Sequence, residues 1–146
     1  MIAYYFSIEI FGTELLIDEI LKILGNKIKI GNIIHPNDKN RKGEKYGFGC
    51  IRLSHPKVYI ADDELVDYFS WLSDFIKEYF DIFCTLGMEE VWFATNIYYT
   101  DSFLSLELFD SDFLKQIASY KISISIPMNI YKETEQKIIK KLRNRP

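Results

Sequence analysis

The feature that most constrains this chain is a two-residue alternation between apolar and polar side chains, which returns in several short runs. The apolar side of the first run consists of Tyr4, Phe6, Ile8 and Ile10. Ser7 and Glu9 fall on the other side of the same run. Because successive side chains of a strand point to opposite faces, such runs form strands with one buried and one solvated face. A sheet built from them needs helices over its apolar face only.

Two amphipathic helices are expected to supply that layer. The shorter one follows the first strand, where Thr13 is placed to cap it and Gly25 followed by Asn26 is placed to end it in a left-handed conformation. The longer one runs from about Asp62 to Phe83, where apolar side chains recur three and four residues apart. Each helix therefore has one apolar stripe to pack on the sheet.

The remaining runs complete an α+β order of elements. Further strands are expected at residues 27–34, 46–54, 91–99, 103–109 and 121–131. Asp110 or Ser111 is expected to cap a short helix that ends near Tyr120. We predict a single domain with a mostly antiparallel sheet and helices on one face. Residues 1–99 match a ferredoxin-like split βαβ, residues 100–131 extend it by a second β-α-β unit, and residues 132–146 form a basic C-terminal helix.

Composition and charge exclude several classes of protein. A chain of 146 residues that is 48% hydrophobic and 27% charged fits one folded domain and excludes a disordered one. A net charge of -3 argues against a protein whose main task is to grip nucleic-acid phosphates. No apolar run approaches the ~20 residues of a membrane span, and the first residues do not resemble a signal peptide. Cys50 and Cys84 form neither a disulfide framework nor a zinc pattern, so we expect a cytoplasmic protein without metal or cofactor.

Carboxylates follow the long helix from its first turn to its last. The residues that we put forward as a partner-binding surface are Asp63, Glu64, Asp67, Asp74, Glu78 and Asp81. The helix dipole favours acids in the first turn but opposes those in the last. The spacing of seven residues from Asp67 to Asp74 to Asp81 predicts that these three share one face. The acids are either an ordinary solvated face or a surface that attracts a basic partner protein.

A charged loop, HPNDKNRKGEKYGFG at residues 35–49, raises an alternative. A phosphate cradle needs glycines that expose backbone N–H groups and usually leads into a helix, whereas this loop leads into a strand. Residues 35–45 are therefore interpreted as a mobile charged hairpin tip. Gly47 and Gly49 are expected on one strand face, where a helix or a ligand can approach closely. The alternative function is a small-ligand or nucleotide-binding domain that uses Lys42, Gly43, Gly47 and Gly49.

The chain also resembles a known kind of family. The opening strand-helix-strand, the Lys42-Gly43 loop, the long helix and the closing stretch SLELFDSDFLKQIASYKISISIPMNIY carry the resemblance. They are similar to an uncharacterised bacterial domain-of-unknown-function family, over nearly the whole chain. The resemblance implies a small cytosolic α/β protein, and some such families are linked to polymorphic-toxin immunity. It implies no catalytic residue.

Catalytic motifs such as GxSxG and HExxH do not occur in the sequence. We therefore predict a non-enzymatic protein-binding module, most specifically an immunity-type inhibitor that occludes the active surface of a cognate toxin such as a nuclease. The expected partner is a basic toxin domain. A homodimer through an exposed strand or the open sheet face is a further expectation, because an aromatic strand such as 91–99 is a liability at a sheet edge. RNA binding by Tyr5, Lys27, Lys29 and Lys121 on the open face is a third alternative.

Overall fold

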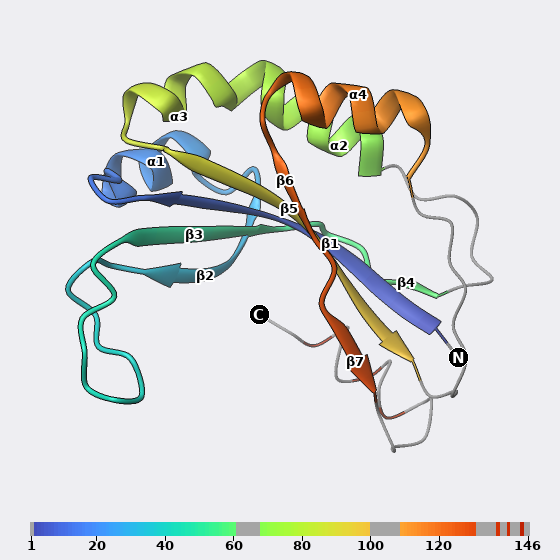
Figure 1. The fold of residues 1–146 in the computed structure, drawn as a ribbon, viewed down its shortest axis with the longest axis horizontal. Coiled ribbons are helices and arrows are strands. Elements are labelled where there is room, and N and C mark those ends of the chain that lie inside the picture. Colours follow the sequence, from blue (N-terminus) through green and yellow to red (C-terminus); the bar gives the residue numbers. More distant parts are fainter. Residues whose placement is uncertain are drawn as a thin grey trace.

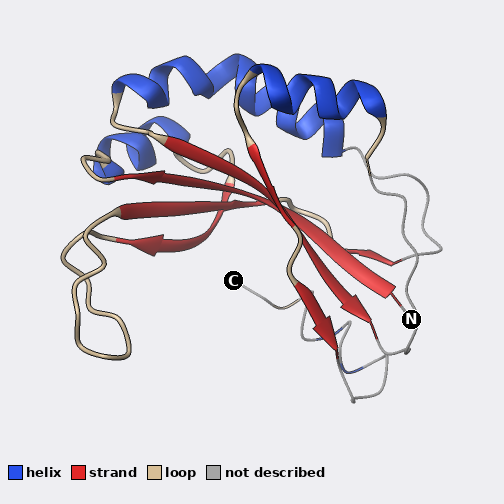
Figure 2. Cartoon of the chain, in the orientation of Figure 1, coloured by secondary structure: helices blue, strands red, loops and turns tan. Residues whose placement is uncertain are grey.

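The chain forms one strongly twisted sheet with helices on one of its faces, as seen in the computed structural model (Figure 1). The structure describes residues 2–60, 68–99 and 109–130, together with Lys137, Lys140 and Asn144. Within these residues the sheet has seven strands, and its main path runs β2-β3-β1-β5-β6. Figure 2 shows the helices gathered above the sheet. The predicted α+β class, with a mostly antiparallel sheet and helices on one face, is confirmed.

The bounds of the elements are as follows. The strands are β1 (Ile2–Gly12), β2 (Lys29–Ile34), β3 (Gly49–Ser54), β4 (Tyr59–Ile60), β5 (Glu90–Tyr99), β6 (Ser123–Ser125) and β7 (Met128–Ile130). The helices are α1 (Ile17–Leu24), α2 (Tyr68–Phe75), the π-helical turn η1 (Ile76–Phe80), α3 (Asp81–Thr85) and α4 (Ser111–Ser119).

Four of these strands reproduce the predicted ferredoxin-like arrangement. β1 lies between β3 and β5 and is antiparallel to both, and β2 lies outside β3, again antiparallel. β1 pairs with β5 from Ile2, opposite Tyr99, to Phe11, opposite Glu90. Its other edge is shared between β3 and the short β4. The first strand of the chain is therefore the central strand of the sheet.

The extension after β5 is a parallel crossover. α4 lies beside α2 in the helical layer (Figure 1) and leads to β6, which lies parallel to β5 at residues 92–94, and β7 continues parallel to β5 at residues 97–99. The single strand predicted at 121–131 is wrong, because it is interrupted at Pro127, which has no N–H group to donate. The carbonyl of Pro127 still accepts the Ile97 N–H at 2.9 Å. Both edges of β5 are thus paired, so the aromatic strand is not an edge strand.

Two predicted elements fall largely outside the described residues. The strand expected at 103–109 lies outside them except for Phe109, and the basic helix expected at 132–146 lies outside them except for three residues. One of those three, Asn144, donates its backbone N–H to the Lys140 carbonyl at 3.2 Å, which is the spacing of an α-helical turn.

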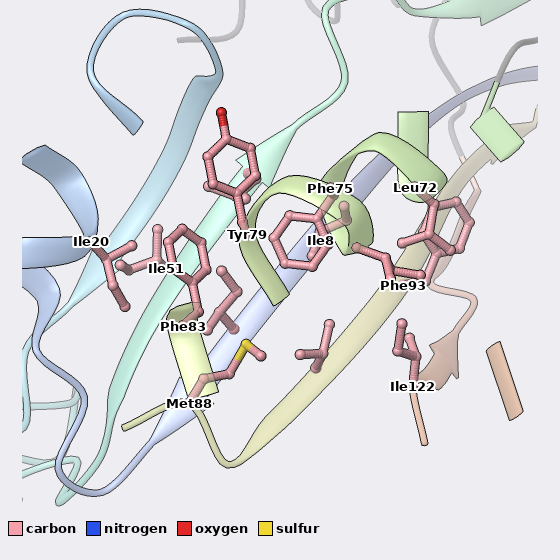
Figure 3. Packing of buried hydrophobic residues seen from close by; sticks show 14 of the residues in the cluster. Ile8, Ile20, Ile51, Leu72, Phe75, Tyr79, Phe83, Met88, Phe93 and Ile122 are labelled. Atoms are coloured by element: carbon pink, nitrogen blue, oxygen red, sulfur yellow. The ribbon is translucent and has the colours of Figure 1, made fainter. Parts of the chain in front are cut away.

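The core lies between the helices and the sheet face below them. Figure 3 shows apolar side chains of both layers meeting there. The sheet supplies Ile8, Ile51 and Phe93, and the long helix supplies Leu72, Phe75 and Phe83, all buried. Burying an aliphatic or aromatic side chain of this size contributes roughly 1.5 to 3 kcal/mol. The apolar side chains of the alternating strands therefore pack against the helices, which cover this one face of the sheet.

The long helix has a π-helical turn in its middle. α2 passes into η1 and then into α3 with helical backbone angles at both junctions. A π-helical turn bonds residue i to residue i+5, so it holds an extra residue and turns the following side chains by about 100° around the axis. The prediction of one regular α-helix is therefore wrong between Ile76 and Phe80, and residues 62–67 lie outside the described part of the chain.

The ends of the shorter helices test the predicted caps. Thr13 does not cap α1, which begins after Leu16 without a side-chain cap, and it hydrogen-bonds to Glu89 instead. The helix does end at Gly25, with a positive φ of 53°, but its ψ of -131° is not that of the left-handed cap. Of the two predicted candidates, Asp110 is the residue that caps α4, since its carboxylate accepts the Phe113 N–H at 2.8 Å.

Candidate functional site

A groove lies between the long helix and the β2-β3 edge of the sheet. It has a volume of about 350 Å³, within the usual size range of small-molecule sites. Its apolar lining includes Ile8, Ile28, Leu53 and Phe75. The charged and aromatic lining residues come from two other parts of the chain, residues 27–29 and the α2-η1 segment, and Ser54 and Pro56 at the end of β3 complete the lining. The α2-η1 segment and the residues around the start of β2 therefore present side chains to the same groove.

The helix contributes two of the predicted partner-binding acids to this groove. Asp74 and Glu78 are exposed, and both line it. Asp81 is also exposed but does not line the groove, as expected from the rotation that η1 introduces. The prediction that Asp74 and Asp81 share one helix face is therefore wrong. The other proposed acids, Asp63, Glu64 and Asp67, lie outside the described residues.

The strand side of the groove is basic. Lys27 and Lys29 line it and are exposed, so the wall opposite the carboxylates carries the same number of positive charges. Because two acids and two lysines line the groove, the groove as a whole does not favour a ligand of either net charge. The acidic side continues along the exposed surface of the long helix, where Asp81 adds a carboxylate. Within the described residues 68–85, Lys77 is the one basic residue. The helix side therefore remains the acidic one.

Aromatic side chains bound the groove at two points. Trp71 lines it and packs edge-on against His55, with ring centroids 5.0 Å apart. The His55 Nδ1 accepts the backbone N–H of Lys57 at 3.1 Å, which fixes the imidazole. Tyr79 lies in the π-helical turn, beside Phe75 and Phe83, with its hydroxyl directed away from them (Figure 3). Burial raises the pKa of the Tyr79 hydroxyl, and the hydrogen bond and charge of Glu78 raise it further.

The charged loop between β2 and β3 forms a hydrogen-bonded hairpin. The Asn40 side chain accepts the backbone N–H groups of Lys42 and Glu44, and the Asn40 carbonyl accepts that of Gly43. The backbone N–H groups around Lys42 and Gly43 are therefore used within the loop. A phosphate cradle needs such groups to point at the ligand, so the tip does not offer one.

The two glycines after the loop have different roles. β3 begins only at Gly49, so Gly47 does not share a strand face with it, which corrects the prediction. Gly47 has a φ of +72° with open space around it, so it is required by the backbone conformation. A side chain at Gly49 would lie 3.1 Å from Leu15 and 3.2 Å from Ile17, so this glycine allows the start of α1 to pack on the sheet. Close helix packing, rather than a ligand, occupies this position.

A second hollow lies at the opposite face of the sheet, near the end of β1. Its volume is about 570 Å³, and its aromatic lining consists of Phe11, Phe48 and Trp92. Glu89 and Glu90 complete the charged part of the lining. The sequence predictions missed this site. The sequence does contain a signal for it. On the strand face that carries Ser7 and Glu9, the next position is the aromatic Phe11, and Trp92, which pairs with Glu9, lies on the same face of the neighbouring strand.

The parts of the chain that the structure describes contain neither a candidate membrane-spanning helix nor a candidate metal site. None of the helices there has both the length and the apolar character needed to cross a bilayer. Within the same residues, no group of three or more histidine, cysteine or acidic side chains is arranged to hold a metal ion.

The comparisons with known proteins leave the family open. No protein-family model, no characterised protein and no solved structure matches this chain significantly.

Proposed function

We propose that the chain is a protein-binding module that recognises a basic protein surface through its long helix. More specifically, we propose an immunity-type inhibitor that neutralises a toxin by covering its active surface and performs no chemistry of its own. The observation that supports this is the helix side of the groove, where the exposed carboxylates of Asp74 and Glu78 lie beside its apolar lining and Trp71.

This combination has the anatomy of a protein interface. Interface centres are apolar and enriched in aromatic side chains, and their rims are polar. Tryptophan is among the residues that lose most binding energy when truncated at an interface. Trp71 is partly buried and held against His55, so a partner side chain that enters the groove meets an ordered ring. The groove can thus accept an anchoring side chain while the helix acids contact cations around it.

The acids of the helix act mainly on the encounter with the partner. Exposed charges at an interface rim raise the association rate and make it depend on salt, because complementary fields steer the two proteins together. A nuclease domain has a basic surface where it binds phosphates, and three helix carboxylates near that surface would attract it. An inhibitor built this way needs no catalytic group.

The test is co-expression with the product of the neighbouring gene in the source genome. Wild-type protein should protect cells from that product and form a complex with it. The variant Asp74→Asn/Glu78→Gln/Asp81→Asn should bind about 10-fold or more weakly at low salt, since each factor of ten corresponds to about 1.4 kcal/mol. Calorimetry or surface plasmon resonance at two salt concentrations measures this.

The matched control is Asp18→Asn/Glu19→Gln/Asp112→Asn, which removes three exposed carboxylates from α1 and α4. It changes the net charge by the same amount and should alter the affinity by no more than about twofold. Equal losses in the two variants would mean that only net charge matters. Failure of wild-type protein to protect cells or to form the complex would refute the immunity proposal.

A further inference from the structure

We propose that the hollow formed by Phe11, Phe48 and Trp92 binds an arginine side chain of a partner protein. This goes beyond the function proposed above, because the hollow lies on the sheet face away from the helices and shares no residue with the groove. The two proposals can therefore fail separately. The occupant follows from the aromatic walls, the carboxylates beside them and the way in which hydrogen bonds hold those carboxylates.

The three aromatic rings form walls rather than a flat surface. The centroid of Phe11 lies 5.4 Å from that of Trp92 and 6.1 Å from that of Phe48. Both pairs are tilted, with interplanar angles of 56° and 58°, so the rings cannot lie in one plane. Phe11, on the central strand, stands between the other two. Each of the three side chains is partly exposed, which leaves aromatic surface available to a ligand.

The carboxylates at this hollow are fixed by hydrogen bonds. Glu89 accepts both the backbone N–H and the hydroxyl of Thr13, and Glu90 accepts the indole N–H of Trp92 at 2.6 Å. All three bonds go to one oxygen of each carboxylate, Oε1. Both glutamates are exposed to solvent. The negative charges are therefore held beside the aromatic walls before any ligand arrives.

Among the residues that the structure describes, the lining carries no positive charge that would neutralise them. The described residues that line it are Phe11, Gly12, Thr13, Phe48, Glu89, Glu90 and Trp92. The nearest acid on the same strand face, Glu9, is already paired with Arg52, whose Nη2 lies 2.8 Å from its Oε1. The hollow is thus a net-negative aromatic site, which attracts cations and repels phosphate groups.

A guanidinium group fits this chemistry best among protein cations. It is planar, stacks on aromatic faces and forms directional hydrogen bonds with carboxylates. An ammonium group also interacts with aromatic faces, but it is more strongly hydrated and lacks the planar fork. An arginine can lay its guanidinium against Phe11 or Trp92 and donate to the remaining oxygens of Glu89 and Glu90. The basic surface that carries it belongs to a partner protein.

The chain has two tryptophans, Trp71 and Trp92, so its indole N–H groups give two signals in a ¹H–¹⁵N spectrum. The probe is a blocked Gly-Arg-Gly peptide, compared with the citrulline peptide of the same shape and no charge, and with the lysine peptide. The arginine peptide should shift the Trp92 signal saturably in the millimolar range and leave the Trp71 signal in place. Lysine should bind more weakly, and citrulline should cause no saturable shift.

Two variants connect the binding to the side chains. Glu89→Gln/Glu90→Gln keeps oxygen acceptors for Thr13 and Trp92 but removes both charges, and it should weaken binding of the arginine peptide about 10-fold or more. Phe11→Leu should also weaken it; because the Phe11 ring lies 5.4 Å from Trp92, the Trp92 signal of the free variant will itself move, and the titration is followed from that new position. Asp18→Asn/Glu19→Gln, on α1, should bind as wild type. Thermal unfolding checks that each variant is folded.

Several outcomes would overturn the proposal. Equal shifts with arginine and citrulline would show that the cation is not recognised. A shift confined to Trp71, or no shift well above millimolar peptide, would place the binding elsewhere or nowhere. A Trp92 signal that depends on protein concentration alone, with dimers seen in sedimentation, would assign the hollow to a second copy of the chain.

Discussion

Two glycines allow the end of β1 to lie against the turn that follows α3. A methyl group on Gly12 would overlap the backbone carbonyl oxygen of Gly87, and one on Gly87 would overlap that of Glu14. Gly87 also has a φ of +89°, which other residues rarely adopt. In both cases the obstacle is backbone, which cannot swing aside as a flexible side chain can. These positions therefore fix how the long helix returns to the sheet.

The first prediction is that Gly12→Ala destabilises the protein by about 3 kcal/mol or more, because overpacking against rigid backbone forces the chain apart. Gly43→Ala is the control. Gly43 has a φ of +82°, but no atom of the described residues lies within 4 Å of the position of its missing side chain, so this change should cost only about 1 to 2 kcal/mol. Urea unfolding of both variants measures the difference. Similar losses would show that β1 does not depend on the Gly12 contact.

The buried thiol of Cys50 makes the protein less stable as the pH rises into the alkaline range. Burial raises the pKa of Cys50 to about 11, with a further rise from Glu9 and a smaller opposing effect of Arg52. In the unfolded chain the thiol ionises near its ordinary value of about 8.5. The folded form therefore binds the proton more tightly, so this stabilisation is complete below pH ~8.5 and is lost as the pH rises towards ~11.

The second prediction is that the free energy of unfolding falls by about 2 kcal/mol across that interval because of Cys50. Cys50→Ala should remove this part of the fall, whereas Cys84→Ala, at an exposed cysteine, should retain it. Denaturant unfolding of the three proteins between pH 8 and 10.5 would measure the slopes, with about half a unit between points. Parallel slopes for wild type and Cys50→Ala would contradict the prediction.

Among the helices, α4 depends on one side chain for its start. The carboxylate of Asp110 accepts the Phe113 N–H, and α4 buries Phe113 and Ile117 against the core. We predict that Asp110→Ala lowers stability by about 1 kcal/mol, the usual loss on removing such a cap. Asp112→Ala in the same turn breaks only an exposed pair with Lys115 and should cost less than half of that. Thermal unfolding of both variants measures the two losses of stability. A larger loss for Asp112→Ala than for Asp110→Ala would contradict the role of the Asp110 cap.

The elements that the sequence predicts well are those whose residues act locally. The Asp110 cap and the extent of β5 follow from side chains within a few residues of each other, and both are confirmed. The π-helical turn leaves no such local sign, because the apolar spacing of residues 72–83 fits a regular α-helix equally well. Thr13 looked like a cap by position, but Glu89, distant in sequence, takes its hydrogen bonds. Contacts of this kind need the tertiary structure.

At the scale of the whole molecule, the order of elements was enough to predict the ferredoxin-like sheet. The binding surfaces were only half predictable. Asp74 and Glu78 stood out as acids, but their position opposite Lys27 and Lys29 depends on how the long helix crosses the sheet. The aromatic hollow joins residues from β1, the end of the charged loop and β5. Such sites are assembled by strand pairing, which a one-dimensional pattern does not reveal.

The central place of β1 also bears on how the protein is made. β1 leaves the ribosome well before its partner β5, which ends at Tyr99, so one edge of the nascent strand waits while the residues between them are made. At typical rates of translation this delay is about 5 to 20 s, and until residues 68–85 are made Phe6, Ile8 and Ile10 lack the long helix that packs over them. Pairing between such distant segments also slows folding itself. One edge of β1 is therefore open to pairing with other chains until β5 has been made.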